Sequence, residues 1–248
     1  MKKKFIVLWV LLLFSILLIS LGCGKNNGDC MTSSGEIILQ ERDIPAFDSI
    51  EVYDYVNLFI SQDTIYKIVV ESGKNIIGGI ETTVENRNLV IHNTNGCNWV
   101  RNYNKPINVY ISTPNLWKIY YNSSGNITSL NTITTDSIKV EVWGGCGKID
   151  LNLDAYIGFF YLQIGTVDIL LSGRCGIVSM YTGDFGLVDA RNLNTAFAFV
   201  SNKSSNDCYI QVHEEFSATI QSIGNIYYTG NPKKIETTIE GSGSVIAF

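Results

Sequence analysis

A repeat of about 20 residues runs through the second half of the chain and constrains its fold more than any other feature. Each period has a glycine or asparagine anchor, and an apolar residue always stands two positions after it. The anchors are Gly125, Gly147, Gly165, Gly186, Asn206, Gly224 and Gly243, and the apolar residues are Ile127, Ile149, Val167, Val188, Cys208, Ile226 and Val245. Short alternating runs of β-branched and aromatic residues fill each period. This pattern predicts an all-β fold, a parallel β-helix (β-solenoid), whose stacked coils bury the inward side chains in ladders.

A β-sandwich with evenly spaced turns is the alternative fold. A sandwich does not require the apolar residue to keep the same phase in every period, so the β-solenoid is preferred. Glycine at the anchors predicts corners with a positive φ, and Asn206 fits because asparagine tolerates that conformation best after glycine.

Residues 44–110 follow a looser pattern, with longer strands and fewer glycines than residues 111–248. We expect one solenoid domain over 44–248, in which 44–110 form a cap and first wide coils and 111–248 form regular coils. The pattern continues to Ala247 and Phe248 with no polar cap. The edge of the last coil is therefore expected to be open to a partner or a second copy.

The N-terminal segment has the features of a bacterial export signal. Lys2, Lys3 and Lys4 precede an apolar run, and Ser20-Leu21-Gly22-Cys23 resembles a lipobox. The sequence predicts a lipoprotein signal peptide over 1–22, lipid attachment at Cys23, and a flexible polar tether over 23–43. Secretion without lipid and an uncleaved anchor are the alternatives. The predicted location is the cell envelope, as an outer-membrane lipoprotein facing either the periplasm or the exterior.

The charge and the cysteine and histidine counts restrict the chemistry. The formal net charge is −5, which gives no electrostatic signature for nucleic acid. Only two histidines occur, and no cofactor motif is present. After Cys23 the cysteine count is odd, and we interpret these cysteines as buried small hydrophobes or isolated pairs of undetermined connectivity, not as a metal site. They are Cys30, Cys97, Cys146, Cys175 and Cys208.

Several short motifs, taken in order, resemble one family. They include Phe47-x-x-Ile50, Val56-x-Leu58-x-Ile60, Asn88-Leu89-x-Ile91, Val109-x-Ile111-x-x-Pro114, Gly125-Asn126-Ile127, Gly224-Asn225-Ile226 and Gly241-Ser242-Gly243. Together they resemble the putative auto-transporter adhesin family with a head GIN domain, a family of envelope lipoproteins, over about residues 44–246. The resemblance implies a β-helical fold. The adhesin name rests on architecture, and a fold does not establish a function.

Three aspartates stand one position after the apolar repeat residues: Asp150, Asp168 and Asp189. If they stack on the outer face, their repulsion favours a bound cation or a carbohydrate-binding face. Lys148 and Arg191 are close enough in sequence to neutralise them, so an ordinary solvated acidic stripe is the preferred interpretation. A carbohydrate-active enzyme using these carboxylates with Arg174 or Arg191 is the least favoured alternative.

Aromatic residues give a second candidate surface: Trp99, Tyr103, Tyr120, Tyr121, Trp143, Tyr227 and Tyr228. One member of each adjacent tyrosine pair must face outward in a strand. His213-Glu214-Glu215 is interpreted as a polar corner, and His92 as a hydrogen-bonded residue at a strand end.

No catalytic constellation is evident, and the sequence predicts a non-enzymatic, adhesin-like binding protein that requires no cofactor. The expected partners are the membrane, through the lipid, and a glycan or protein ligand, with no nucleic acid. An envelope assembly protein that self-associates into a homo-oligomer through its open end is the alternative.

Overall fold

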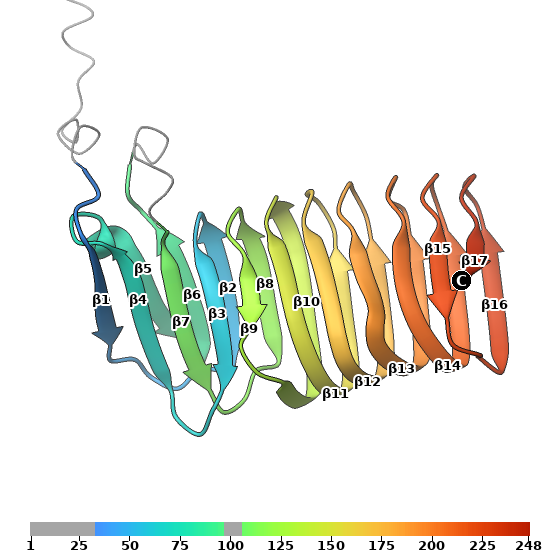
Figure 1. The fold of residues 1–248 in the computed structure, drawn as a ribbon, viewed down its shortest axis with the longest axis horizontal. Helices are drawn as coiled ribbons and strands as arrows, with labels where there is room; N and C mark the ends of the chain where they lie inside the picture. The colour runs from blue at the N-terminus through green and yellow to red at the C-terminus, as the bar shows by residue number, and fades with distance from the viewer. Residues whose placement is uncertain (1–32, 97–105) are drawn as a thin grey trace, which may run out of the picture. The chain divides into compact units, whose positions relative to one another are not determined.

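The computed structural model describes residues 33–96 and 106–248, and all of these except Ser33 and Gly96 belong to one compact unit (Figure 1). The expected signal peptide, Cys23, Cys30, Cys97, Trp99 and Tyr103 lie outside the described residues. Among the residues that are described, no helix is long and apolar enough to cross a membrane.

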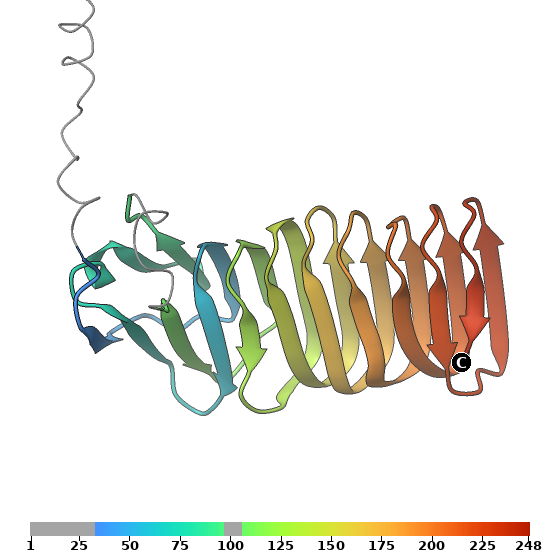
Figure 2. The same ribbon diagram turned by 45° about the horizontal axis from the view of Figure 1, so that its top comes forward.

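The unit is a β-solenoid with coils of about 20 residues, as the sequence predicts (Figures 1 and 2). The only helical element in the described ranges is a 3-10 turn, η2, Ile77–Gly79. The strands are β1 Ile37–Arg42, β2 Ser49–Asp54, β3 Asn57–Gln62, β4 Lys67–Gly73, β5 Ile80–Glu85, β6 Asn88–Asn93, β7 Asn108–Thr113, β8 Lys118–Ser123, β9 Ile127–Ser129, β10 Ile133–Gly145, β11 Lys148–Leu162, β12 Asp168–Thr182, β13 Val188–Asn202, β14 Cys208–Ile220, β15 Ile226–Thr229, β16 Lys234–Ile239 and β17 Val245–Ala247.

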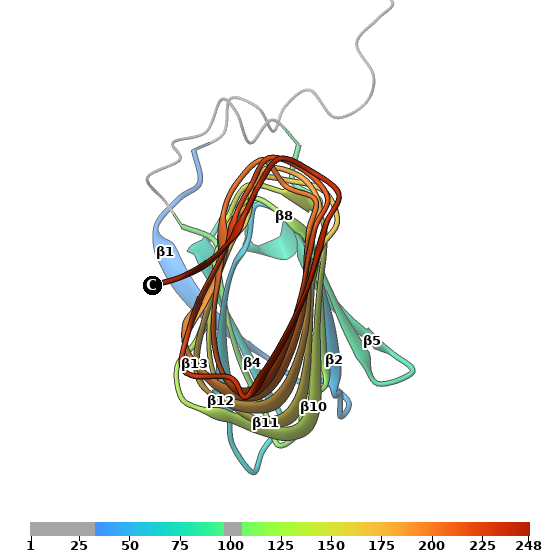
Figure 3. The ribbon, with the colours of Figure 1, turned by 90° about the vertical axis from the view of Figure 1, so that its right-hand side faces the viewer.

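Each coil has two long sides, seen along the stack in Figure 3. Face A contains, in order, β5, β6, β2, β8, the C-terminal halves of β10 to β14, and β16. Face B contains β1, β4, β7, β3, β9, the N-terminal halves of β11 to β14, β15 and β17. From β8 to β17 every pairing is parallel, because each coil winds in the same direction as the one before.

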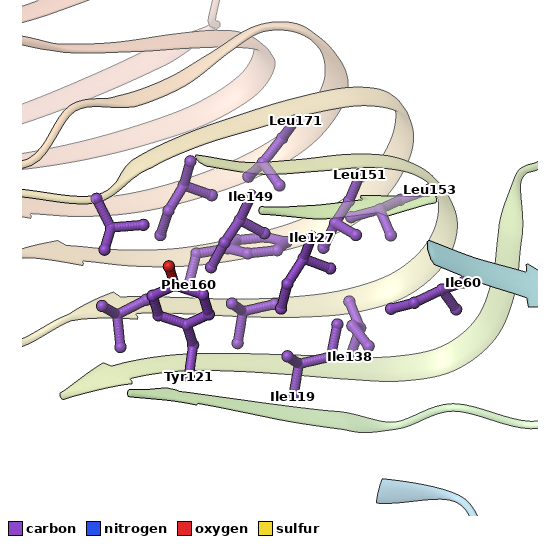
Figure 4. Packing of buried hydrophobic residues seen from close by; sticks show 14 of the residues in the cluster. Ile60, Ile119, Tyr121, Ile127, Ile138, Ile149, Leu151, Leu153, Phe160 and Leu171 are labelled. Carbon is purple, nitrogen blue, oxygen red and sulfur yellow. The ribbon is translucent and has the colours of Figure 1, made fainter. Parts of the chain in front are cut away.

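The core lies between the two faces and consists of ladders of inward side chains (Figure 4). The predicted inward residues Ile127, Ile149, Val188 and Ile226 are all fully buried. One position differs: Ile149 pairs with Ile169 rather than with Val167, which is buried beside the ladder. The solenoid prediction is thus confirmed, with a two-residue error in one coil.

The reason for glycine at most corners is not the one expected. Among the predicted anchors only Gly165 has a positive φ, at 121°. A Cβ at Gly147 would instead lie 2.0 Å from the carbonyl oxygen of Gly125, and one at Gly243 would lie 2.2 Å from that of Gly224. Glycine is required at these corners because successive turns of backbone stack too closely to admit a side chain.

The N-terminal coils are not stacked in sequence order. β2 lies between β6 and β8, and β3 lies between β7 and β9, so the first coil of the sequence is enclosed by later ones. β4 and β5 extend the sheet by antiparallel pairing with β7 and β6. β1 pairs with β4, so the expected tether over 23–43 is too long: residues 37–42 belong to the sheet.

Candidate functional site

The three aspartates singled out in the sequence do not form a ladder. The register places Asp168 beside Lys148, and it places Leu170 between Asp150 and Asp189. The predicted ladder is wrong because Ile169, and not Val167, continues the inward ladder from Ile149, which shifts the outward positions of that coil by two residues.

Each of the other two aspartates has a basic partner on its own strand. Asp150 is 2.8 Å from the Lys148 ammonium, and Asp189 is 2.8 Å from the Arg191 guanidinium. These groups form ordinary surface ion pairs, and of the three aspartates it is Asp189 that pairs with Arg191. Within the described ranges, no group of three or more His, Cys, Asp or Glu residues could hold a metal ion.

The predicted aromatic surface is divided between the two faces. Tyr121 is fully buried and Tyr228 packs against the core, so Tyr120 and Tyr227 are the outward members of their pairs, as expected. The Tyr120 ring lies 5.8 Å from that of Tyr53 on face A, whereas Tyr227 stacks 5.2 Å from Tyr209 on face B. These residues therefore form two separate groups.

The two histidines have structural roles. The His92 ring stacks on Tyr53 at 4.3 Å, and its Nδ1 atom lies 3.4 Å from Asp54 Oδ2. The cluster at His213 is a polar corner within β14, where the pairing register shifts between the face B and face A halves of the strand, and Glu214 pairs with Lys233 of the next coil at 2.5 Å. Both interpretations are confirmed.

Two of the three described cysteines are buried free thiols. Cys175 and Cys208 lie in different ladders, and Cys146 is exposed. Burial raises the pKa of Cys175 to about 11 and also raises the pKa of Cys208, so neither forms a thiolate near neutral pH. The two buried cysteines pack as small hydrophobes, whereas Cys146 does not.

An outward apolar patch at the middle of face A is the feature most suggestive of function. Ile157 of β11 pairs with Ile177 of β12, which pairs with Phe197 of β13. In the same strands Phe159 and Phe199 flank Ser179, and Tyr161 pairs with Tyr181. We define the central patch as Ile157, Phe159, Tyr161, Ile177, Tyr181, Phe197 and Phe199.

The side chains of the central patch are at least partly exposed, and some of them contact each other or Ser179. Phe197 and Phe199 are 38% and 51% exposed. The Tyr161 hydroxyl lies 3.2 Å from Ser179 Oγ, and its ring lies 6.2 Å from that of Phe159. Adjacent apolar side chains on a flat sheet form a continuous surface, which in soluble proteins commonly marks a contact site.

Charged groups border the central patch on both sides. On β10, Glu141 lies 2.7 Å from Lys139 and 3.5 Å from Lys118 of β8. On β14, Glu215 pairs with Phe197 of β13 and lies 4.0 Å from Lys234 of β16. An apolar centre with a polar rim is the usual anatomy of a protein-binding surface.

The central patch is not among the surfaces predicted from the sequence, although the sequence contains a signal for it. Residues 155–162 form a run without a charged side chain, and both inward and outward positions are apolar. In a half-buried strand the outward positions are normally polar, so a strand that is apolar on both sides indicates a second covered face.

Comparisons with known proteins agree with the fold. The model of the family described as "Putative auto-transporter adhesin, head GIN domain" matches residues 46–232. A putative adhesin from Bacteroides fragilis is 21% identical, with a TM-score of 0.79 over 86% of this chain and 97% of that one.

Two proteins from Parabacteroides distasonis have the same fold. A putative adhesin is 16% identical, with a TM-score of 0.66 over 86% of this chain and 98% of its own. A putative lipid binding protein is 17% identical, with a TM-score of 0.60 over 87% of this chain and 98% of its own. No curated protein matches the chain in sequence.

Proposed function

Because the chain belongs to the putative auto-transporter adhesin family with a head GIN domain, we propose that it is a non-enzymatic, adhesin-like protein of the bacterial cell envelope. Its binding surface is the central patch of face A, and its ligand there is a protein. The single observation that carries this proposal is the continuous outward apolar surface across β11, β12 and β13.

The form of the patch supports a protein ligand. A flat face of large side chains has no enclosed cavity for a small molecule, but it can bury a large contact area. Phe197 and Phe199 supply aromatic anchors of the kind that dominate the binding energy of protein interfaces. Parallel strands hold them on a rigid sheet, so little conformational entropy is lost on binding.

The binding test uses the full chain and immobilised fibronectin, laminin and collagen. Replacement of both aromatic anchors, F197S with F199S, is expected to weaken binding to the recognised protein at least tenfold, because the apolar centre of the contact is lost. The matched control is Phe185→Ser, since Phe185 is 60% exposed but lies in a turn outside the patch. Absence of binding to all three proteins, or equal loss in the control, contradicts the proposal.

Lipid attachment at Cys23 is the second part of the proposal, and it rests on the lipobox-like sequence. Cells expressing the wild-type chain should incorporate radiolabelled palmitate into it and retain it in the outer-membrane fraction. Cys23→Ser should lose the label and release the protein from that fraction. Protease treatment of intact cells then distinguishes exposure at the cell exterior from exposure to the periplasm.

Self-association is a second candidate function, favoured by the sequence of β16. Within the described structure β16 pairs only with β14, and Ile235 and Ile239 border a hollow of about 330 Å³. An antiparallel copy of β16 centred on Thr237 would place Ile235 opposite Ile239 on the inner side and Lys234 opposite Glu240 on the outer side. A twofold axis of this kind also makes β17 antiparallel to its counterpart, so both faces continue through the interface.

A charge exchange tests the pairing. Sedimentation of the full-length Cys23→Ser chain should show a dimer, and Lys234→Glu should weaken it because two like charges then face each other. The combined K234E and E240K variant should restore the dimer. A monomer at all concentrations, or no recovery in the combined variant, excludes this arrangement.

A further inference from the structure

A polar hollow lies at the corner between β8 and β11, at the edge of face A. Its volume is about 700 Å³. The lining residues are Asn115, Trp117, Thr134, Thr135, Asp136, Ser137, Asp154, Ala155 and Tyr156. The hollow adjoins the central patch, because Ser137 pairs with Ile157, but the two share no residue.

Two aromatic side chains in the lining are unusually accessible. Trp117 is 46% exposed and Tyr156 is 66% exposed, although both rings could have been buried in a β-rich unit. Alternation with Ile119 and Tyr121 would turn Trp117 inward, but β8 begins only at Lys118, and just before it Leu116 is the buried residue and Trp117 the exposed one. Two exposed rings that line the same hollow provide apolar faces on which a ligand can stack.

The indole of Trp117 is fixed in place by neighbouring coils. Its Nε1–H group donates a hydrogen bond to Asp48 Oδ1 at 3.1 Å. The other oxygen of Asp48 accepts a hydrogen bond of 2.6 Å from Arg87 Nε. The ring is therefore held as a rigid platform before any ligand arrives, which lowers the entropic cost of binding.

Two carboxylates, those of Asp136 and Asp154, line the hollow together with the two rings. The register of β10 and β11 places Asp136 next to Tyr156, because Thr135 pairs with Ala155 and Ser137 pairs with Ile157. Asp154 is held by Arg174 Nη2 at 2.8 Å. Carboxylate oxygens accept hydrogen bonds from hydroxyl groups, and the threonine and asparagine groups of the lining add donors and acceptors.

The spacing of the two rings sets the size of the ligand. Trp117 precedes β8 and Tyr156 belongs to β11, with β10 between them. Adjacent strands are about 4.8 Å apart, so the two positions are separated by about 10 Å across the sheet. This separation exceeds the width of a single pyranose ring, and a ligand that contacts both platforms must be an oligomer.

We propose that this hollow binds a neutral oligosaccharide. The apolar C–H faces of the sugar rings stack on Trp117 and Tyr156, and the hydroxyl groups donate to Asp136 and Asp154. An acidic sugar is disfavoured, because its carboxylate would face two others in the hollow. The proposal deepens the binding role proposed above by adding a ligand class, and it depends on none of the residues of the central patch.

The test is calorimetric titration of the full chain with cellopentaose, laminaripentaose, mannopentaose and chitopentaose, each compared with its monosaccharide and with oligogalacturonate. At least one neutral pentasaccharide should bind, with affinity at least tenfold above its monosaccharide and above oligogalacturonate. Trp117→Ala should weaken that binding at least tenfold, and Tyr156→Ala should weaken it to a similar extent.

Matched controls separate binding from stability. Trp143 is 45% exposed, almost the same as Trp117, and lies outside the hollow, so Trp143→Ala should bind like the wild type. Asp48→Asn should weaken binding less than Trp117→Ala does, because the ring remains but loses a charged acceptor.

The outcomes distinguish this proposal from the patch proposal. F197S with F199S should leave oligosaccharide binding unchanged, and Trp117→Ala should leave protein binding unchanged. The saccharide proposal is overturned if no neutral pentasaccharide binds at millimolar concentration, if Trp143→Ala has the same effect as Trp117→Ala, or if monosaccharide and pentasaccharide bind equally.

Discussion

The coils from β1 to β7 and those from β8 to β17 use the same inward alternation but differ in how the chain connects them. In the regular coils the strands reach 13 to 15 residues, and partners such as Asp154 and Arg174 are 20 residues apart in sequence. In the N-terminal coils most strands have six residues, and the hydrogen bond from Trp117 to Asp48 joins positions 69 residues apart.

The difference shows that the N-terminal end of a solenoid can be closed without a separate cap, by coils that stack out of sequence order. We call the coils from β1 to β7 the interleaved coils. β2 is held on both edges, by β6 and β8, before the regular coils begin. The regular coils contact only their neighbours, so their stability is approximately a sum of nearest-neighbour terms. The interleaved coils have no such independence, because strands that are neighbours in the stack, such as β2 and β8, come from coils that are not consecutive in the chain.

The largest expected effect comes from two equally buried isoleucines. Ile50 lies in β2 beside Leu89 and Ile119, and Ile226 lies in β15 beside Cys208 and Val245. Each change to alanine should cost about 2–5 kcal/mol locally. Hydrogen exchange should accelerate throughout the unit in Ile50→Ala, but only in β14 to β17 in Ile226→Ala.

If Ile226→Ala also accelerates exchange in β2 to β8, the regular coils unfold together with the interleaved ones, and the proposed difference between the two regions is wrong.

The corner glycines allow the same comparison with a smaller change. A Cβ at Gly125 would lie 1.9 Å from the carbonyl oxygen of Val56, in the interleaved coil, and one at Gly243 would meet Gly224. Both alanine variants should lose about 1–3 kcal/mol by overpacking, but Gly125→Ala should lower the urea midpoint of the whole unit, and Gly243→Ala only that of the last coil.

Gly78→Ala is the control, because nothing lies within 4 Å of the added Cβ. It should leave the urea midpoint unchanged or raise it slightly. A loss in Gly78→Ala comparable to that in Gly125→Ala would show that close stacking is not the reason for glycine at the corners.

A buried amide tests how the regular coils keep their register. Asn202 Oδ1 accepts a hydrogen bond from Thr182 Oγ1 at 2.6 Å, and Nδ2 donates to the carbonyl oxygens of Asn206 and Asn225 at 3.0 and 3.1 Å. Asn202→Ala should lower the free energy of unfolding by about 1–3 kcal/mol, because buried polar groups of three coils lose their partner.

The control for this amide is Asn194→Ala, since Asn194 lies in the same strand, β13, but is exposed. Denaturation in urea should place it within about 0.5 kcal/mol of the wild type. Equal stability of Asn202→Ala and the wild type would show that water satisfies the freed groups.

The smallest effect is electrostatic. Burial raises the pKa of Glu141, but Lys139 and Lys118 outweigh it and hold the pKa below its ordinary value. The ionised carboxylate therefore adds stability above its ordinary pKa of about 4.3, and this is lost as the pH falls through the lower folded pKa. Glu141→Gln should lower Tm at pH 7 by a few degrees at most, with the difference disappearing in acid.

A Tm difference between Glu141→Gln and the wild type that stays constant from pH 7 to pH 2 would mean that the glutamate acts through packing rather than charge.

Much of the regular region could be predicted because its signal is local. Inward residues such as Ile127, Ile149 and Val188 recur with the coil, and all are buried. The aspartate ladder could not be predicted reliably, because Val167 and Ile169 are both apolar and two residues apart. A shift of two residues preserves the alternation of a strand, so the pattern alone cannot choose between them.

The candidate sites were less predictable than the core. Phe197 and Phe199 are adjacent outward residues of one strand, but their union with Ile157 and Ile177 requires the register across three coils. Trp117 and Asp136 likewise meet at one hollow only because β8 and β10 are neighbours. The spacing of residues along the sequence does not show which strands lie side by side, so it could not predict these contacts.

The sequence by itself determined that the chain winds into coils of about 20 residues with alternate side chains inward, because alternation and corner glycines act within each coil. Only the tertiary structure decided which coil lies on which, and hence that β2 is enclosed between β6 and β8. The physical reason is that the backbone groups of a strand pair equally well with any neighbour. The choice depends on the packing of side chains from distant parts of the chain.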